Sequence, residues 1–205
     1  MLKKAQENLQ KRQDLMIIAD IIPPKSKVLD LGCGNGDLLH ILKEKKDVYA
    51  CGVEISQEKI LECVNKGVSV IHGDLNNGLG EFLDSSFDFV VLSQTIQAVQ
   101  RPDKLLDDMM RIGKTSLVSF MNIGFWQARF QLFFKGTMPV TATLPHKWYN
   151  TPNIHLATIK DFKNLCREKN IKIRQEIPFG DNLNFAAKLF PNLFAPTCVF
   201  CIEKL

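Results

Sequence analysis

Glycine occupies every second position in one short stretch of the sequence, Gly32-Cys33-Gly34-Asn35-Gly36. This stretch follows the strand-like run Val28-Leu29-Asp30-Leu31 and precedes a helical pattern that begins at Asp37. Glycine reaches positive φ and has no Cβ, so the turn can bring the backbone close to a ligand. The spacing differs from the phosphate-binding G-x-G-x-x-G fingerprint, whose last glycine is replaced here by Asp37. We therefore expect a ligand without phosphate groups; the alternative is a tight turn without a ligand.

Polar side chains follow the next three predicted strands. Glu54 ends the second strand, where a carboxylate can accept hydrogen bonds from both hydroxyls of a ribose. Asp74 follows the third strand and can accept the amine of an adenine while Leu75 packs on the ring. Ser93 and Gln94 end the fourth strand. Ligands bind outside the carboxyl ends of parallel strands, so these residues predict one site. Solvated side chains are the alternative.

Strands and helices alternate over most of the chain, as the positioning of such a site requires. A helix within residues 1–24 ends at Pro23-Pro24, and residues 25–120 form the expected cofactor-binding half. The predicted strands there span 27–31, 48–53, 68–71, 87–92 and 116–120, and the helices start at Asp37, Ser56 and Pro102. This alternation predicts an α/β fold, a mostly parallel sheet with helices on both faces.

Residues 121–157 break this alternation and form an aromatic and proline-rich insert. Residues 158–205 then provide a helix from Thr158 to Lys169 and strands at 171–177 and 197–203, which predict an antiparallel pair. We expect a single domain. Cys198 and Cys201 form a C-x-x-C pair on a predicted strand, where their side chains point to opposite faces, so we expect buried thiols and no metal site.

The composition is typical of a globular domain. The chain has 205 residues, 45% of them hydrophobic, 23% charged, and a net charge of +4. This charge is too small to indicate a nucleic-acid or membrane surface. Six scattered cysteines without a secretory signal favour reduced thiols and a cytoplasmic location, and no apolar run is long enough to span a membrane.

These motifs resemble class I S-adenosylmethionine-dependent methyltransferases from about residue 25 onward. The segments DLGCGNGDLL, GVEIS, VIHGDLNNGL, FDFVVLSQTIQAVQRP and MPVTATLPHKWYNTPNIHLATIKDF are more specifically similar to the MetW family of methionine biosynthesis. The resemblance implies a Rossmann-like, seven-stranded methyltransferase fold that binds S-adenosyl-L-methionine or S-adenosyl-L-homocysteine. It places Asp30, Gly32, Gly34 and Gly36 around the methionine moiety and ribose, Glu54 on the ribose, and Asp74 with Leu75 at the adenine. Cys33, Ile55, Ser93 and Gln94 complete the expected cofactor-binding set.

The resemblance also implies a partner, the homoserine O-acyltransferase MetX. We expect an accessory protein that supports this enzyme, with the aromatic insert as a partner surface and S-adenosylmethionine as a sensed end product. The alternative is an active methyltransferase on an unidentified small molecule, with the insert over the acceptor. A third possibility is a module that has lost the ligand.

Catalysis of methyl transfer to a hydroxyl or amine would need a group that removes a proton. His72, His146 and His155 are the candidates, and His155 in the insert is the weak choice for a catalytic residue, against a structural or surface role. The chain lacks the Asn/Asp-Pro-Pro-Tyr motif of amino-methylating enzymes, because Ser93-Gln94-Thr95 stands at its place after the fourth strand.

Overall fold

One seven-stranded sheet organises the molecule. The computed structural model describes residues 12–180 and 185–205. The strands are β1 (Lys27–Leu31), β2 (Tyr49–Glu54), β3 (Ser69–His72), β4 (Phe87–Ser93), β5 (Gly113–Met121), β6 (Ile171–Phe179) and β7 (Thr197–Lys204). They lie in the order β3-β2-β1-β4-β5-β7-β6. The first five are mutually parallel and β7 is antiparallel to both of its neighbours, which confirms the predicted fold class.

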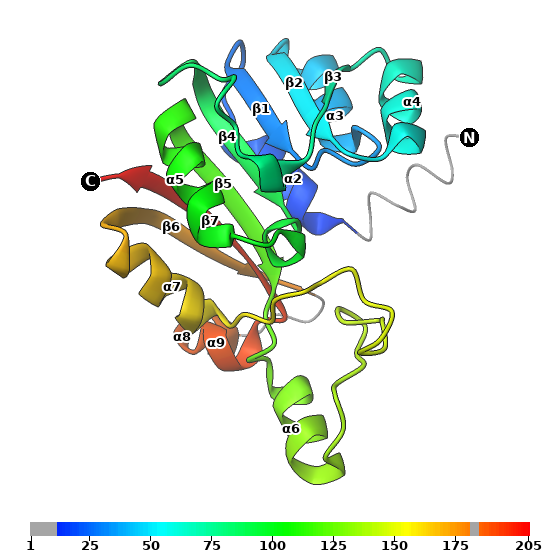
Figure 1. Cartoon of the computed structure of the whole chain (residues 1–205). Helices are drawn as coiled ribbons and strands as arrows, with labels where there is room; N and C mark the ends of the chain where they lie inside the picture. The colour runs from blue at the N-terminus through cyan, green and yellow to red at the C-terminus, as the bar shows by residue number, and fades with distance from the viewer. Residues whose placement is uncertain (1–11, 181–184) are drawn as a thin grey trace.

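Helices cover both faces of this sheet (Figure 1). The helices of the described residues are α2 (Gln13–Ile21), α3 (Asp37–Lys46), α4 (Gln57–Asn65), α5 (Pro102–Ile112), α6 (Trp126–Lys135), α7 (Ile159–Glu168), α8 (Phe185–Leu189) and α9 (Pro191–Phe194), with 3-10 turns η1 (Leu75–Asn77) and η2 (Ile96–Ala98). α5 and α7 contribute to one apolar core, and α2 and α3 to a second. The central strands are buried on both sides, as parallel strands with helices on both faces require.

Most predicted elements agree with the structure within a few residues. Thr158 caps α7 and forms a capping box with Asp161, while Ser56 caps α4. Cys198 and Cys201 belong to the cores on opposite faces of the sheet, as their spacing predicts. The part of the predicted N-terminal helix that precedes residue 12 lies outside the described residues. Within those that are described, no helix has the length and apolar character that crossing a membrane requires.

The insert contains a helix that the sequence analysis did not predict. α6 extends away from the sheet, and the chain returns to the sheet through a long loop (Figure 1). Trp126, Phe130, Phe133 and Phe134 recur at helical spacing, a signal that could have identified this helix. The stripe is exposed to solvent, unlike a core-facing helix stripe.

Asn122 joins the end of β5 to the C-terminal part of the chain. Its buried Nδ2 donates to the carbonyls of Asn192 (3.1 Å) and Ala195 (2.8 Å). Its Oδ1 accepts from the amides of Gly124 (2.9 Å) and Ile159 (3.2 Å). All four hydrogen-bonding positions of the amide are therefore used, and the side chain has a structural role.

We predict that Asn122→Asp lowers the free energy of unfolding by about 2–4 kcal/mol, because a carboxylate would face two carbonyl oxygens that lose their donors. Urea denaturation measures the change. Asn164→Asp, at a half-buried position on α7, is the control and should change the stability little. Equal stability of Asn122→Asp and the wild type would contradict this structural role.

Candidate functional site

The carboxyl ends of the first strands and the turns that follow them surround a cavity of about 400 Å³. Its lining includes many of the predicted site residues: Gly32, Glu54, Ile55, Asp74, Leu75 and Gln94. They come from four separate turns, and the parallel register of β1, β2, β3 and β4 brings these turns to one edge. The structure thus brings these six predicted residues to the lining of one cavity.

Glu54 holds two of these turns together. Its Oε2 accepts the amide of Gly34 at 2.8 Å, and its Oε1 accepts the amides of Ile55 and Ser56, each at 3.0 Å. The carboxylate is buried, with 5% of the residue exposed. Ionised carboxylate oxygens accept about four hydrogen bonds in total, so capacity for at least one ligand hydroxyl is left.

The glycine turn requires glycine for two different reasons. Gly32 has φ of 70°, and a Cβ there would lie 2.7 Å from Cγ2 of Thr95. Gly34 has φ of 59°, and a Cβ there would meet nothing within 4 Å. Gly32 therefore permits close packing inside the protein, whereas Gly34 faces open space beside Glu54 where a ligand can approach.

Asp74 and Leu75 form another part of the lining. Oδ1 of Asp74 accepts the backbone amide and the side-chain Nδ2 of Asn76, both at 2.9 Å, and so caps η1. Asn76 itself lines the cavity. This arrangement leaves Oδ2 of Asp74 as an acceptor beside the half-buried Leu75, which is the pairing that an adenine amine and ring would need.

Asp30 lies in a second, smaller cavity of about 60 Å³ that shares Gly32 with the first. Only 3% of the residue is exposed, and its Oδ1 has no hydrogen-bond partner among the described residues. Burial raises the pKa of Asp30 to about 7; Arg12 opposes this rise, and Asp14 and Glu54 add to it. An unpartnered buried carboxylate at a cavity offers an acceptor to a donor that the protein itself does not supply.

Arg12 and Asp14 were missed by the sequence analysis. Nε and Nη2 of Arg12 donate to the two carboxylate oxygens of Asp14 at 2.9 and 3.0 Å. Asp14 is fully buried and also accepts from the hydroxyls of Ser93 (2.6 Å) and Ser119 (3.2 Å). Burial by itself would raise the pKa of Asp14, but the hydrogen bonds and charge of Arg12, with the two serines, hold it below its usual value.

A signal for Asp14 existed in the sequence. It stands four residues before the buried Ile18, so it lies on the apolar face of its helix. A carboxylate on such a face needs a buried partner. The predicted residue Ser93 belongs to this network and lines the smaller cavity, not the larger one.

Gln94 lines two cavities: the one of about 400 Å³ described first, and a third one of about 580 Å³. Its φ of 51° lies in the left-handed region, which is uncommon for a residue other than glycine. Pro152 and Asn153 of the insert line both cavities, and His146 lines the third. The loop that returns from α6 therefore forms a wall of the candidate site.

The other predicted residues lie apart from the larger cavity. Nε2 of the exposed His155 lies 3.2 Å from the carbonyl of Gln100, and His155 lines none of the cavities described above. The thiol of Cys33 lies 4.0 Å from that of Cys63, and burial raises its pKa, which disfavours the nucleophilic thiolate.

The residues present fit an S-adenosyl ligand. Glu54 offers acceptors for ribose hydroxyls, Asp74 and Leu75 offer an amine acceptor and an apolar contact, and Gly34 faces open space in the turn that Glu54 holds. The unpartnered Oδ1 of Asp30 adds an acceptor close to the glycine turn. These acceptors and the apolar contact match a nucleoside with an attached cationic group.

We predict that Asp30 makes the stability depend on pH. Its pKa rises from 3.8 to about 7 on folding, so its contribution to stability is fully present below pH 3.8 and is lost as the pH rises through about 7. Between about pH 5 and pH 8 the wild type should lose about 3 kcal/mol relative to Asp30→Asn, which cannot ionise. Urea denaturation of both proteins across this range measures the difference, and parallel pH curves would disprove the prediction.

Known proteins resemble the chain in sequence and fold. Residues 12–202 match the family model described as methionine biosynthesis protein MetW. The bifunctional methionine biosynthesis protein MetXA/MetW of Rhodopirellula baltica is 36% identical over 199 residues, which is 91% of this chain and 32% of that protein. The chain thus spans about a third of the length of this relative.

Solved structures agree on the fold. An S-adenosylmethionine-dependent methyltransferase from Mesorhizobium loti has a TM-score of 0.67 and 16% identity, covering 95% of this chain and 98% of that one. A second, from Archaeoglobus fulgidus, has a TM-score of 0.64 and 17% identity, covering 96% and 94%. With its strand order, its glycine turn and the match over nearly its whole length, the chain belongs to the MetW family of methionine biosynthesis proteins.

Proposed function

We propose that this protein binds S-adenosylmethionine or S-adenosylhomocysteine and acts as an accessory partner of the homoserine O-acyltransferase MetX. The observation that carries the partner is the Rhodopirellula baltica relative, in which MetXA and MetW form one chain. Two activities that are fused in one protein are held at high mutual concentration, which favours a functional contact between them. The cavity lined by Glu54 and Asp74 supports the ligand.

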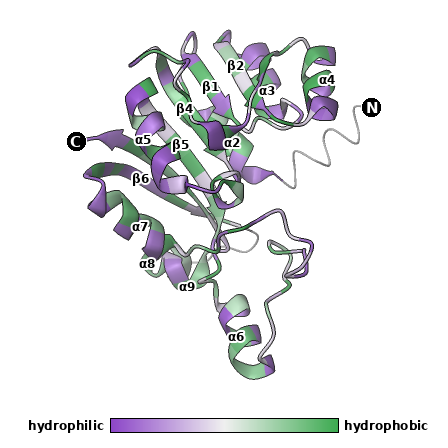
Figure 2. Ribbon diagram, in the orientation of Figure 1, coloured by the Kyte–Doolittle hydropathy of each residue, from purple (hydrophilic) through white to green (hydrophobic). Residues whose placement is uncertain are grey.

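The exposed aromatic face of α6 is the partner surface in this proposal. Phe130, Phe133 and Phe134 are 53%, 81% and 66% exposed, and Phe134 packs against both other rings at centroid distances of 4.4 and 4.9 Å. Figure 2 shows hydrophobic residues along this projecting helix. A contiguous exposed apolar patch is typical of a protein interface, where aromatic residues are enriched.

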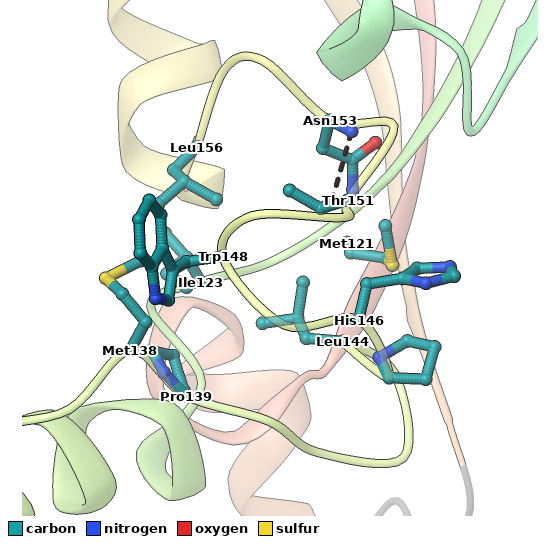
Figure 3. Close-up of a pocket in the computed structure, with 11 residues that line it drawn as sticks. Met121, Ile123, Met138, Pro139, Leu144, His146, Trp148, Thr151, Asn153 and Leu156 are labelled. Carbon is teal, nitrogen blue, oxygen red and sulfur yellow. Dashed lines mark hydrogen bonds between the residues drawn. The ribbon is translucent and has the colours of Figure 1, made fainter.

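A second apolar cluster lies in the same insert. Trp148 is 74% exposed and lines a small hollow of about 40 Å³ together with Met138 and Leu156. In Figure 3 its indole ring lies beside these two side chains. The insert thus offers large apolar side chains on both α6 and the returning loop.

The insert also offers a physical connection between partner and ligand. The carbonyl of Gln97 accepts the amides of Ile154 (2.9 Å) and His155 (3.0 Å). In the side chain of Gln97, Nε2 donates to the carbonyl of Met121 and Oε1 accepts the amide of Met121. These hydrogen bonds fix the returning loop at Ile154 and His155, directly after Pro152 and Asn153, which line the ligand cavity. A ligand that prefers one position of this loop would change the affinity for the partner, and the reverse effect must be equal.

Methyl transfer to a small molecule is the second candidate function. The third cavity, of about 580 Å³, shares Gln94, Pro152 and Asn153 with the ligand cavity. His146 also lines the third cavity, so an acceptor bound in it would lie beside the cofactor. The cofactor when bound would supply the methyl group. Formation of S-adenosylhomocysteine only on addition of a small-molecule extract would favour this function.

We predict that Glu54→Gln raises the dissociation constant of S-adenosylhomocysteine by about 5- to 150-fold, equivalent to about 1–3 kcal/mol, because charge-assisted hydrogen bonds to the ribose are lost. Titration calorimetry measures the constant. Glu58→Gln removes the same charge at an exposed position nearby and should leave binding unchanged. Equal affinity of Glu54→Gln and the wild type would remove Glu54 from the site.

We predict that the wild type increases the rate of acyl transfer from acyl-CoA to homoserine by the cognate acyltransferase, and that S-adenosylmethionine changes this increase. Phe133→Glu and Trp148→Ala should weaken association with the acyltransferase at least about tenfold, because desolvated aromatic anchors dominate interfaces. Co-purification and the acyl-transfer rate measure this effect.

Tyr49→Ser is the matched control, since Tyr49 is also an exposed aromatic residue, 72% accessible, but lies on β2. Each variant should bind S-adenosylhomocysteine like the wild type. An acyl-transfer rate that is unchanged by the protein, with and without ligand, would reject the accessory function. Loss of ligand binding in Trp148→Ala would instead assign Trp148 to the ligand site.

A further inference from the structure

The aromatic residues of α6 form a stripe along one side of the helix. Trp126, Phe130 and Phe133 stand at positions i, i+4 and i+7, which share one side of a helix. They are 45%, 53% and 81% exposed. Ala128, the buried residue of α6, stands on the opposite side by the same spacing. The stripe therefore points away from the rest of the molecule, from which α6 projects (Figure 1).

Leu132 is an exposed apolar residue of α6 that lies outside this stripe. Its exposed fraction of 52% is nearly equal to that of Phe130. At 3.6 residues per turn, however, it lies about half a turn around the helix axis from Phe130. The two residues therefore distinguish binding through one side of α6 from binding through any exposed apolar side chain.

Hydrogen bonds to the neighbouring loops hold α6 in place. Nε of Arg129 donates to the carbonyl of Gly124, and the amide of Val140 in the returning loop donates to Oε1 of Gln131 at 3.1 Å. A helix of 10 residues is marginal by itself in water, so these contacts help to stabilise it. The stripe is thus formed before a partner arrives, which lowers the entropy cost of binding.

The charge of the insert has a single sign. Residues 121–157 contain three basic residues and no aspartate or glutamate, although the whole chain has 26 basic and 22 acidic residues. Lys135 ends α6, Lys147 directly precedes Trp148, and Arg129 lies beside the stripe. Lys135 and Lys147 are exposed, and neither is paired with a carboxylate of the described residues. This positive surface attracts a partner surface of negative charge.

We propose that α6 docks as a helix into an apolar groove of the acyltransferase, with Trp126, Phe130 and Phe133 in the groove and the two lysines facing an acidic rim. Helices that bind in apolar grooves use side chains at i, i+4 and i+7, as this stripe does. The inference rests on the proposed partnership with the acyltransferase. It adds the shape and the charge of the surface that the partner must present.

An anionic membrane also attracts aromatic and cationic side chains, but α6 fits it less well. Helices that lie on membranes carry lysine and arginine along their polar face, whereas α6 has Gln127 and Gln131 next to its stripe. Lipid-binding clusters contain about four to eight basic residues. The insert contains three, so a groove on a protein is favoured.

The binding kinetics of the full-length chain on the immobilised acyltransferase test the groove. Phe130→Ala should weaken binding at least about tenfold, mainly through faster dissociation, because buried aromatic side chains dominate interfaces. Leu132→Ala is the matched control and should bind like the wild type, since it removes an equally exposed side chain from outside the stripe. Thermal melting verifies that both variants are folded.

The same measurement tests the acidic rim. The double variant Lys135→Glu and Lys147→Glu should associate at least about threefold more slowly at low ionic strength, because rim charges act on the association rate. About 0.5 M NaCl should remove most of this difference by screening. Lys104→Glu reverses an exposed charge on α5 and should leave the association rate unchanged.

A selective loss in Phe130→Ala together with slower association of the double lysine variant supports the inference. Equal effects of Phe130→Ala and Leu132→Ala, or an unchanged association rate of the double variant, overturn it and leave the proposed function intact. Wild-type binding to phosphatidylglycerol vesicles that Phe130→Ala abolishes, with unchanged binding of this variant to the acyltransferase, overturns it in favour of a membrane. Failure of the wild type to bind or activate the acyltransferase overturns the proposed function and this inference with it.

Discussion

The carboxylate of Glu54 joins the two turns on which the rest of the site depends. It accepts the amide of Gly34 from the turn after β1 and those of Ile55 and Ser56 from the turn after β2. Backbone amides in a turn have no strand partner, so a buried anion satisfies them and sets the spacing of the turns. The open space at Gly34 lies beside this contact, and Glu54 also lines the cavity of about 400 Å³.

Two further buried carboxylates, Asp14 and Asp30, differ from each other in their hydrogen-bond partners. Asp14 has its full set of partners in Arg12, Ser93 and Ser119, and these hold its pKa low against the effect of burial. Asp30 has an unpartnered oxygen, and burial raises its pKa to about 7. One buried carboxylate is thus fully satisfied, whereas its neighbour keeps an unused acceptor beside a cavity, which a donor from outside the protein can reach.

The insert joins two surfaces of different character. Its helix α6 exposes three phenylalanine rings, one of which, Phe134, packs against the other two, and its returning loop forms a wall of the ligand cavity through Pro152 and Asn153. Gln97 attaches that loop to the end of β5. In the proposed function, this segment contacts the partner through α6 and borders the ligand through its returning loop.

The amino-acid sequence by itself determined the alternation of strands and helices from β1 to β5, and the places of the glycine turn, Glu54, Asp74 and Leu75 at the ends of these strands. These features follow from local patterns: apolar periodicity, capping residues such as Thr158, and polar residues placed directly after strands. The tertiary structure decided that Arg12 and Asp14 lie beside Asp30, that Ser93 belongs to their network, and that Pro152 and Asn153 close the cavity. Each of these contacts joins residues far apart in the chain, whose pairing depends on how the helices and the insert pack, and local periodicity carries no information about such packing. The same reason explains α6: its stripe of aromatic residues has helical spacing, but only the fold leaves that stripe exposed.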